Sequence, residues 1–109
     1  MVVIDTEEEG LEMIFKWWEA PLYKKLLTED IKMITREAWE YILDQIYPQT
    51  LSRASVIFSL QEYAEKGILK ASETTGKGGY RGVFSRNMNL EEFWKHIANQ
   101  VNQALEPHI

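Results

Sequence analysis

The feature that most constrains this chain is a change of hydrophobic period at Gly67. Before it, over residues 56–63, apolar residues recur at helical spacing. After it, residues 68–72 and 80–86 form two short strand-like stretches around a glycine-rich segment, which predicts a β-hairpin. Glycine readily adopts the left-handed conformation that ends many helices, so Gly67 is expected to close the helix as a Schellman cap, with Ile68 as the apolar residue after it.

An amphipathic helix is predicted near the N-terminus, over about residues 7–27. Thr6 and Glu9 have the spacing of a capping box at its start. The apolar residues of its core stripe are Leu11, Ile14, Phe15, Trp18 and Leu22. Pro21 is expected to end or kink the helix, because proline lacks the N–H that a helix interior uses.

Two helices joined by a short turn are predicted over about residues 35–66, with Ser52 as the N-cap of the second. The hairpin follows over about residues 68–86, and a last helix over about residues 89–105. No repeat or linker divides the chain, so residues 1–109 are expected to form one mostly helical α+β domain. This order is the winged helix-turn-helix arrangement, with additional N- and C-terminal helices.

The segment Ser52–Leu69 has a Ser-Val start, apolar residues four and seven positions after the valine, and a Lys-Gly-aliphatic-Leu exit. These positions are Ser55-Val56, Leu60, Tyr63 and Lys66-Gly67-Ile68-Leu69. In this pattern the chain resembles winged-helix transcriptional regulators, in particular the MarR-like and penicillinase-repressor-like groups. A basic tip and an aromatic second strand within residues 75–85 resemble the penicillinase repressors as well. The resemblance covers about residues 35–86 and implies a sequence-specific DNA-binding regulator, by family habit a dimeric repressor.

Candidate DNA contacts follow if the helix that starts at Arg53 enters the major groove with its apolar stripe turned inward. Arg53 can hold a guanine or a phosphate, Gln61 can read adenine, and Phe58 can pack on a thymine methyl group. Serine hydroxyls at the helix start suit phosphate oxygens, and cations on the wing can follow the backbone. The predicted DNA-binding residues are Ser52, Arg53, Ser55, Phe58, Gln61, Lys77 and Arg81.

The formal net charge of −5 by itself argues against a nucleic-acid partner. The charge is uneven, however: residues 1–49 carry −6, residues 50–86 carry +3 and residues 87–109 carry −2. The basic third contains the predicted recognition helix and wing, so the total does not exclude double-stranded DNA. The acidic total and an outward Phe58 leave an alternative open, a winged-helix protein–protein interaction module that does not bind DNA.

The two terminal helices are predicted to form a homodimer interface, because regulators of this type bind two-fold sites. The predicted interface residues are Met13, Trp17, Phe93, Trp94, Ile97, Val101 and Leu105. The alternative is that the two helices pack on each other within a monomer. Trp17, Trp18 and Trp94 leave two further interpretations open, a pocket for a small-molecule effector at this interface or packing alone.

Enzyme and metal chemistry find no support in the sequence. The chain has no cysteine, and its only histidines are His96 and His108, so a thiolate or metal-sensor site is not expected. Gly76-Lys77-Gly78-Gly79 lacks the spacing of a phosphate-binding loop. We therefore expect no catalytic residues, no metal and no cofactor. Without a membrane-length apolar stretch or the pattern of a signal peptide, a cytoplasmic location without membrane contact is expected.

Overall fold

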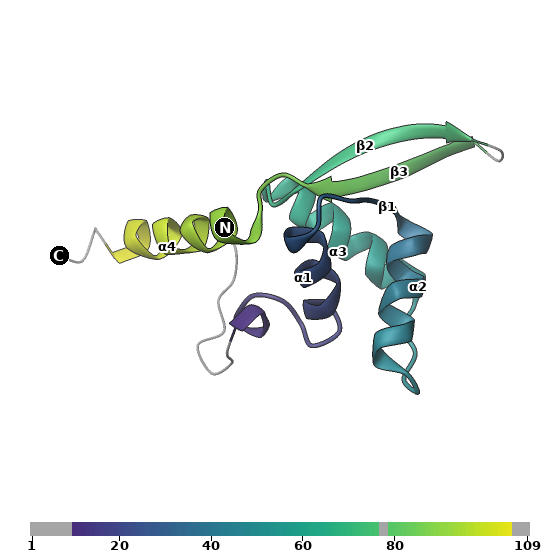
Figure 1. Cartoon of the computed structure of the whole chain (residues 1–109), viewed down its shortest axis with the longest axis horizontal. Coiled ribbons are helices and arrows are strands. Elements are labelled where there is room, and N and C mark those ends of the chain that lie inside the picture. The colour runs from purple at the N-terminus through teal and green to yellow at the C-terminus, as the bar shows by residue number, and fades with distance from the viewer. Residues whose placement is uncertain (1–9, 77–78, 106–109) are drawn as a thin grey trace.

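The structure is a computed structural model that describes residues 10–76 and 79–105, without the side chains of residues 73–76, 79–81 and 105. Over these ranges the chain forms a short 3-10 helix, four α-helices and a three-stranded antiparallel sheet, which confirms a mostly helical α+β fold. The elements are η1 (Gly10–Met13), α1 (Ala20–Thr28), β1 (Lys32–Ile34), α2 (Thr35–Ile46), α3 (Arg53–Glu65), β2 (Leu69–Gly76), β3 (Gly79–Arg86) and α4 (Leu90–Leu105) (Figure 1).

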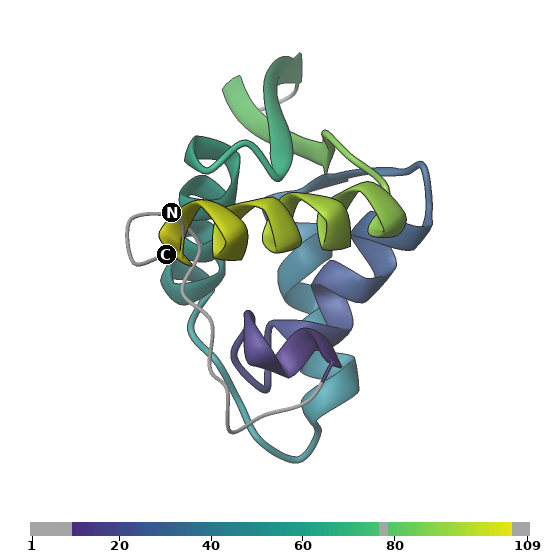
Figure 2. The ribbon, with the colours of Figure 1, turned by 90° about the vertical axis from the view of Figure 1, so that its left-hand side faces the viewer.

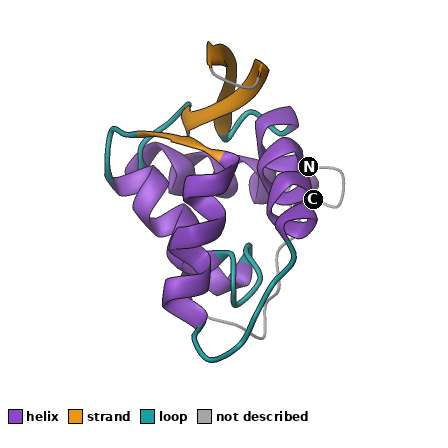
Figure 3. Cartoon of the chain, turned by 90° about the vertical axis from the view of Figure 1, so that its right-hand side faces the viewer, coloured by secondary structure: helices purple, strands orange, loops and turns teal. Residues whose placement is uncertain are grey.

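The sheet lies along one side of the helices α1, α2 and α3 (Figure 3). The β2–β3 hairpin and α4 extend toward opposite ends of the molecule (Figure 1). The molecule measures 55 × 32 × 22 Å and its radius of gyration is 15.0 Å, whereas a compact domain of this length has a radius near ~13 Å. Both extensions therefore present surface that the other described parts of the chain do not cover.

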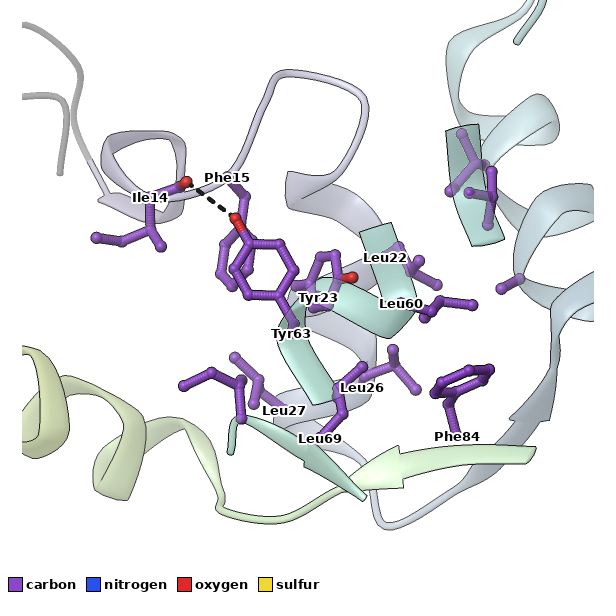
Figure 4. Packing of buried hydrophobic residues seen from close by; sticks show 14 of the residues in the cluster. Ile14, Phe15, Leu22, Tyr23, Leu26, Leu27, Leu60, Tyr63, Leu69 and Phe84 are labelled. Atoms are coloured by element: carbon purple, nitrogen blue, oxygen red, sulfur yellow. Dashed lines mark hydrogen bonds between the residues drawn. The ribbon is translucent and has the colours of Figure 1, made fainter. Parts of the chain in front are cut away.

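One hydrophobic core joins the helices to the sheet. An aromatic cluster lies at its centre, where the rings of Phe15 and Tyr23 stack with their centroids 4.3 Å apart. Tyr63 of α3 packs at 4.8 Å from the first ring and 4.9 Å from the second. Its hydroxyl donates a long hydrogen bond of 3.4 Å to the carbonyl of Ile14, and Phe84 of β3 is buried on the sheet side of the same core (Figure 4).

The prediction of one N-terminal helix over residues 7–27 is wrong. In the described part of this region the chain forms η1, then a turn, then α1. Pro21 lies in the first turn of α1 and so begins that helix instead of ending it, because an N–H is not needed at this position. The Glu19 carboxylate holds the preceding turn by accepting a hydrogen bond of 2.8 Å from the N–H of Lys16. The capping box predicted at Thr6 lies outside the described residues.

The strand β1 was not predicted. It has only three residues and pairs antiparallel with β3, with Met33 opposite Phe84, so the sheet order is β1-β3-β2. The helix α2 follows directly, and the Glu37 carboxylate accepts a hydrogen bond of 3.0 Å from the N–H of Ile34 at its start. Three residues are too few to show the alternation of apolar and polar residues that predicts a strand. Only the pairing with β3 identifies this segment as one.

The start and end of α3 are confirmed as predicted. Ser52 caps the helix, since its hydroxyl accepts a hydrogen bond of 3.2 Å from the N–H of Ser55. At the other end, Gly67 has φ +81° and the N–H of Ile68 donates to the carbonyl of Tyr63 at 3.0 Å. These are the marks of a Schellman cap, and the side chain of Ile68 is fully buried behind it.

The hairpin strands run further toward the tip than predicted, because their register continues as far as Gly76 opposite Gly79. The last helix begins as predicted. Asn89 accepts a hydrogen bond of 2.8 Å from the N–H of Glu92, and the Glu92 carboxylate accepts one of 3.1 Å from the N–H of Asn89. None of the helices in the described ranges is long and apolar enough to cross a membrane.

Candidate nucleic-acid interface and the groove beside it

The helix α3 carries most of the predicted DNA-binding residues. Ser52 and Arg53 lie exposed together at its N-terminal end, and Phe58 is 70% exposed near its middle. Ser55 and Phe58 line a groove on the side of the N-terminal segment, whereas Gln61 lines a cavity on the side of the hairpin. The structure therefore brings Ser52, Arg53 and Ser55 together at the helix start, where the Ser52 and Ser55 hydroxyl oxygens lie 2.8 Å apart. Phe58 and Gln61 are exposed further along α3.

A hydrogen bond fixes the turn that sets α3 against α2. The indole N–H of Trp39 on α2 donates to the carbonyl of Leu51 at 2.8 Å. Two residues later α3 begins, and its Val56 and Leu60 are fully buried against the core. The inward stripe predicted for this helix is thus confirmed, and its N-terminal turn is left on the surface.

The basic middle of the chain is distributed over α3 and the hairpin. Lys70 is exposed on β2. Lys77 lies outside the described residues, and Arg81 lies on β3 without a described side chain. Of the basic groups that the structure describes in this segment, Arg53 and Lys70 face solvent.

Arg86 has a structural role instead. Its guanidinium donates a hydrogen bond of 3.3 Å to the carbonyl of Leu27 in the last turn of α1, and its Nε lies 4.0 Å from the carboxylate of Asp30. A cation at this place also suits the partial negative charge of a helix C-terminus. This positive charge joins β3 to α1 and contributes little to an anion-binding surface.

A buried polar cluster joins α3 to the start of α1. The Ser59 hydroxyl donates a hydrogen bond of 2.5 Å to the Glu19 carboxylate. Because that hydroxyl proton is used, the Tyr23 hydroxyl is the donor in its 2.8 Å bond to Ser59. Burial raises the pKa of Tyr23 well above its ordinary value, and the nearby Glu19 charge acts in the same direction.

Sequence reasoning missed both members of this contact. Ser59 falls on the inward stripe of α3, between Val56 and Leu60, and Glu19 stands between aromatic residues and a proline. A polar residue on an apolar stripe needs a partner. The partner of Ser59 depends on the turn before α1, which brings Glu19 to it. The prediction of one continuous helix did not contain this turn.

A groove of about 610 Å³ lies between α3 and the segment from Glu12 to Glu19. Its apolar lining consists of Met13, Ile14, Phe15, Trp18, Phe58 and Tyr63. Its polar lining consists of Glu12, Lys16, Glu19, Ser55, Ser59, Glu62 and Lys66. The Lys66 ammonium is paired with Glu62 at 3.5 Å.

The residues predicted for a dimer interface have different environments. Phe93 and Ile97 are buried in the core of this chain, because the first half of α4 packs on the helices beneath it, so they are not open to a partner. Met13 and Trp94 are half-buried against the same core. Trp17 at 55% and Val101 at 39% are exposed, and the side chain of Leu105 lies outside the description.

Two of the three tryptophans of the suggested effector pocket line different cavities. Trp18 is buried and lines the groove beside α3. Trp94 lines a separate pocket of about 760 Å³ between α1, α2 and α4. Trp17 contributes to neither of these two cavities.

Within the described ranges, no group of three or more His, Cys, Asp or Glu side chains is placed to hold a metal ion. No family model, no curated protein and no solved structure gives a significant match to this chain.

Proposed function

We propose that this chain is a winged helix-turn-helix protein that binds double-stranded DNA, with α3 in the major groove. The observation that supports this most is the exposed N-terminal turn of α3, where Ser52 and Arg53 lie together. Such a turn suits phosphate oxygens, and arginine suits either a phosphate or the edge of guanine.

The hairpin would act as the wing. It leaves α3 directly after the Schellman cap, and it extends toward the end of the molecule opposite α4, where α3 also begins (Figure 1). Lys70 is exposed on β2, and the sequence places Lys77 and Arg81 around the tip. Cations on such an arm would follow the DNA backbone beside the helix.

Beyond its first turn, the exposed surface of α3 suits contacts with bases better than contacts with phosphates. Ala54, Phe58 and Gln61 form an uncharged strip, with a ring suited to a thymine methyl and an amide suited to adenine. Glu62 and Glu65 follow on the same surface and would repel phosphates. The C-terminal end of α3 would therefore lie away from the DNA backbone.

A homodimeric repressor is the form of regulator that we infer. The helix α4 is amphipathic and projects from the body (Figure 1), and it crosses the face of the molecule that Figure 2 shows. Its Val101 is exposed beyond the part that packs on the core. A second copy that covers this end would place two α3 helices on a two-fold site, and a protein seated there would block access to the DNA.

Fluorescence anisotropy with a random-sequence duplex at low salt tests the proposal. We expect the wild type to bind, and Arg53→Ala to weaken binding and to lower the salt slope by about 0.9. Lys95→Ala on α4 is the matched control, since it also removes one exposed cation, here 73% exposed, and should leave the slope unchanged. Absence of wild-type binding, or equal effects of the two substitutions, would overturn the proposal.

A protein–protein interaction module is the second candidate, because of a specific observation. Phe58 leaves a large apolar surface, 70% exposed, at the middle of the proposed recognition helix. Exposed aromatic rings are frequent anchors in protein interfaces. The same titration separates the two functions, since an interaction module would show no salt-dependent affinity for the duplex.

A further inference from the structure

The buried carboxylate of Glu19 has no cationic partner among the residues that the structure describes. Its residue is only 4% exposed. Among the described residues, no lysine or arginine nitrogen lies within 4.0 Å of its oxygens. Two hydrogen bonds hold it, from the N–H of Lys16 and from the hydroxyl of Ser59. Buried carboxylates are ordinarily paired with a cation, because a charge withdrawn from water needs compensation.

The groove that Glu19 lines already attracts ammonium groups to its aromatic rings. The Lys66 ammonium lies 5.2 Å from the ring centre of Tyr63. The Lys16 ammonium lies 5.9 Å from the ring of Trp18. Both distances are in the range of cation–π attraction, so the faces of these rings attract positive charge.

The charges around the groove leave one carboxylate in excess. Glu12, Glu19 and Glu62 line it together with Lys16 and Lys66. Of the two ammonium groups, that of Lys66 is committed to Glu62. The remaining charge on the groove lining is therefore negative. Burial raises the pKa of Tyr63, and the nearby Glu19 charge acts in the same direction.

We propose that this groove is a binding site for a small organic cation, an ammonium group carried on an aromatic body. The ammonium would face Glu19, and the aromatic body would lie between Phe58 and Met13. The groove volume of about 610 Å³ falls within the range of about 300 to 1,000 Å³ that is usual for small-molecule sites. This site needs no DNA and goes beyond the proposed DNA-binding function.

The test uses two probes that share a benzene ring and differ in the sign of their charge. Benzyltrimethylammonium and benzenesulfonate are each titrated into the full chain, and backbone amide shifts are followed by NMR. We expect the cation to shift amides along the groove, at Met13, Ser59 and Glu62, and the anion to leave them unchanged. Equal shifts from both probes, or shifts confined to other parts of the chain, would overturn the proposal.

Two substitutions assign the contacts. Glu19→Gln keeps a hydrogen-bonding side chain and removes the charge, so the affinity for the cation should fall by about tenfold or more. Phe58→Ala removes an exposed ring from the groove wall and should weaken binding several-fold. Tyr47→Ala is the matched control, because Tyr47 is 84% exposed and does not line the groove, and it should bind like the wild type.

If Glu19→Gln fails to fold, the comparison of Phe58→Ala with Tyr47→Ala still decides the test. Phe58 at 70% and Tyr47 at 84% are both exposed, so neither substitution threatens the core. Weaker binding in Phe58→Ala alone supports the site, whereas equal binding in the two variants overturns it. No duplex is present, so this outcome is independent of the DNA-binding test.

Discussion

Ser59 on α3 donates a hydrogen bond of 2.5 Å to the carboxylate of Glu19, which lies 40 positions earlier in the chain. Both residues are buried, and the Tyr23 hydroxyl completes the cluster at 2.8 Å from Ser59. Over the described residues, no buried side-chain nitrogen or oxygen lacks a hydrogen-bond partner. The contact therefore ties the position of α3 to the turn before α1.

Removal of the Ser59 hydroxyl should destabilise the fold. Ser59→Ala leaves the Glu19 carboxylate and the Tyr23 hydroxyl each without one partner, which should lower the free energy of unfolding by about 1–3 kcal/mol. Urea titration followed by circular dichroism measures this. Ser72→Ala removes an exposed hydroxyl from β2 and should change stability by less than about 0.5 kcal/mol. Equal losses in the two variants would contradict a stabilising role for the cluster.

Gly67 should tolerate no ordinary side chain without cost. Its φ of +81° is left-handed, and a Cβ placed there would have no atom within 4 Å, so the cost is conformational alone. We expect Gly67→Ala to lower the free energy of unfolding by about 1–2 kcal/mol. Gly67→Asn should cost less, since asparagine adopts this conformation more readily. Thermal unfolding measures the stability of the wild type and of both variants. If Gly67→Asn loses as much stability as Gly67→Ala, the left-handed conformation is not the cause.

Alkaline pH should unfold the protein through its buried tyrosines. Burial raises the pKa values of Tyr23 and Tyr63 above the ordinary value of 10.0. Their stabilising contribution is therefore complete below about pH 10 and declines as the pH rises further, because only the unfolded chain releases these protons readily. Tyrosinate absorbance should thus report their ionisation together with unfolding.

Two variants test the alkaline transition. Tyr63→Phe loses only a long hydrogen bond of 3.4 Å and should unfold at a higher pH than the wild type. Tyr47→Phe, at a side chain 84% exposed, should leave the transition unchanged. If the wild type and Tyr63→Phe unfold at the same pH, the buried hydroxyl is not the cause.

A charge at the exposed end of α4 should dissociate the proposed homodimer. Val101 lies on the apolar side of the helix and is 39% exposed, so Val101→Glu would place a carboxylate in the interface. Asn99→Glu adds the same charge at an exposed position roughly opposite on the helix and should keep the dimer. Light scattering at tens of micromolar measures the mass, and a monomeric wild type would remove homodimerisation from the proposal.

Local patterns were sufficient for the elements whose ends are marked by their own residues. Ser52, Gly67 and Asn89 sit where the caps of α3 and α4 require them, because capping depends on residues three or four positions apart. The inward stripe of α3 could be predicted for the same reason. The region around Pro21 could not, since proline is compatible both with the end of one helix and with the start of another, and packing of Phe15 against Tyr23 favours the second.

The sequence by itself determined the mostly helical α+β class, the cap at Gly67 and the uneven charge, because each depends on neighbours along the chain. Only the tertiary structure decided which polar residues meet. It created β1 by pairing it with β3, buried Glu19 against Ser59, and placed Phe93 inside the core instead of on a free face. Contacts between residues 40 positions apart depend on the direction in which a turn sends the chain. The hydrophobic periods of strands and helices, 2 and 3.6 residues, contain no information about that direction.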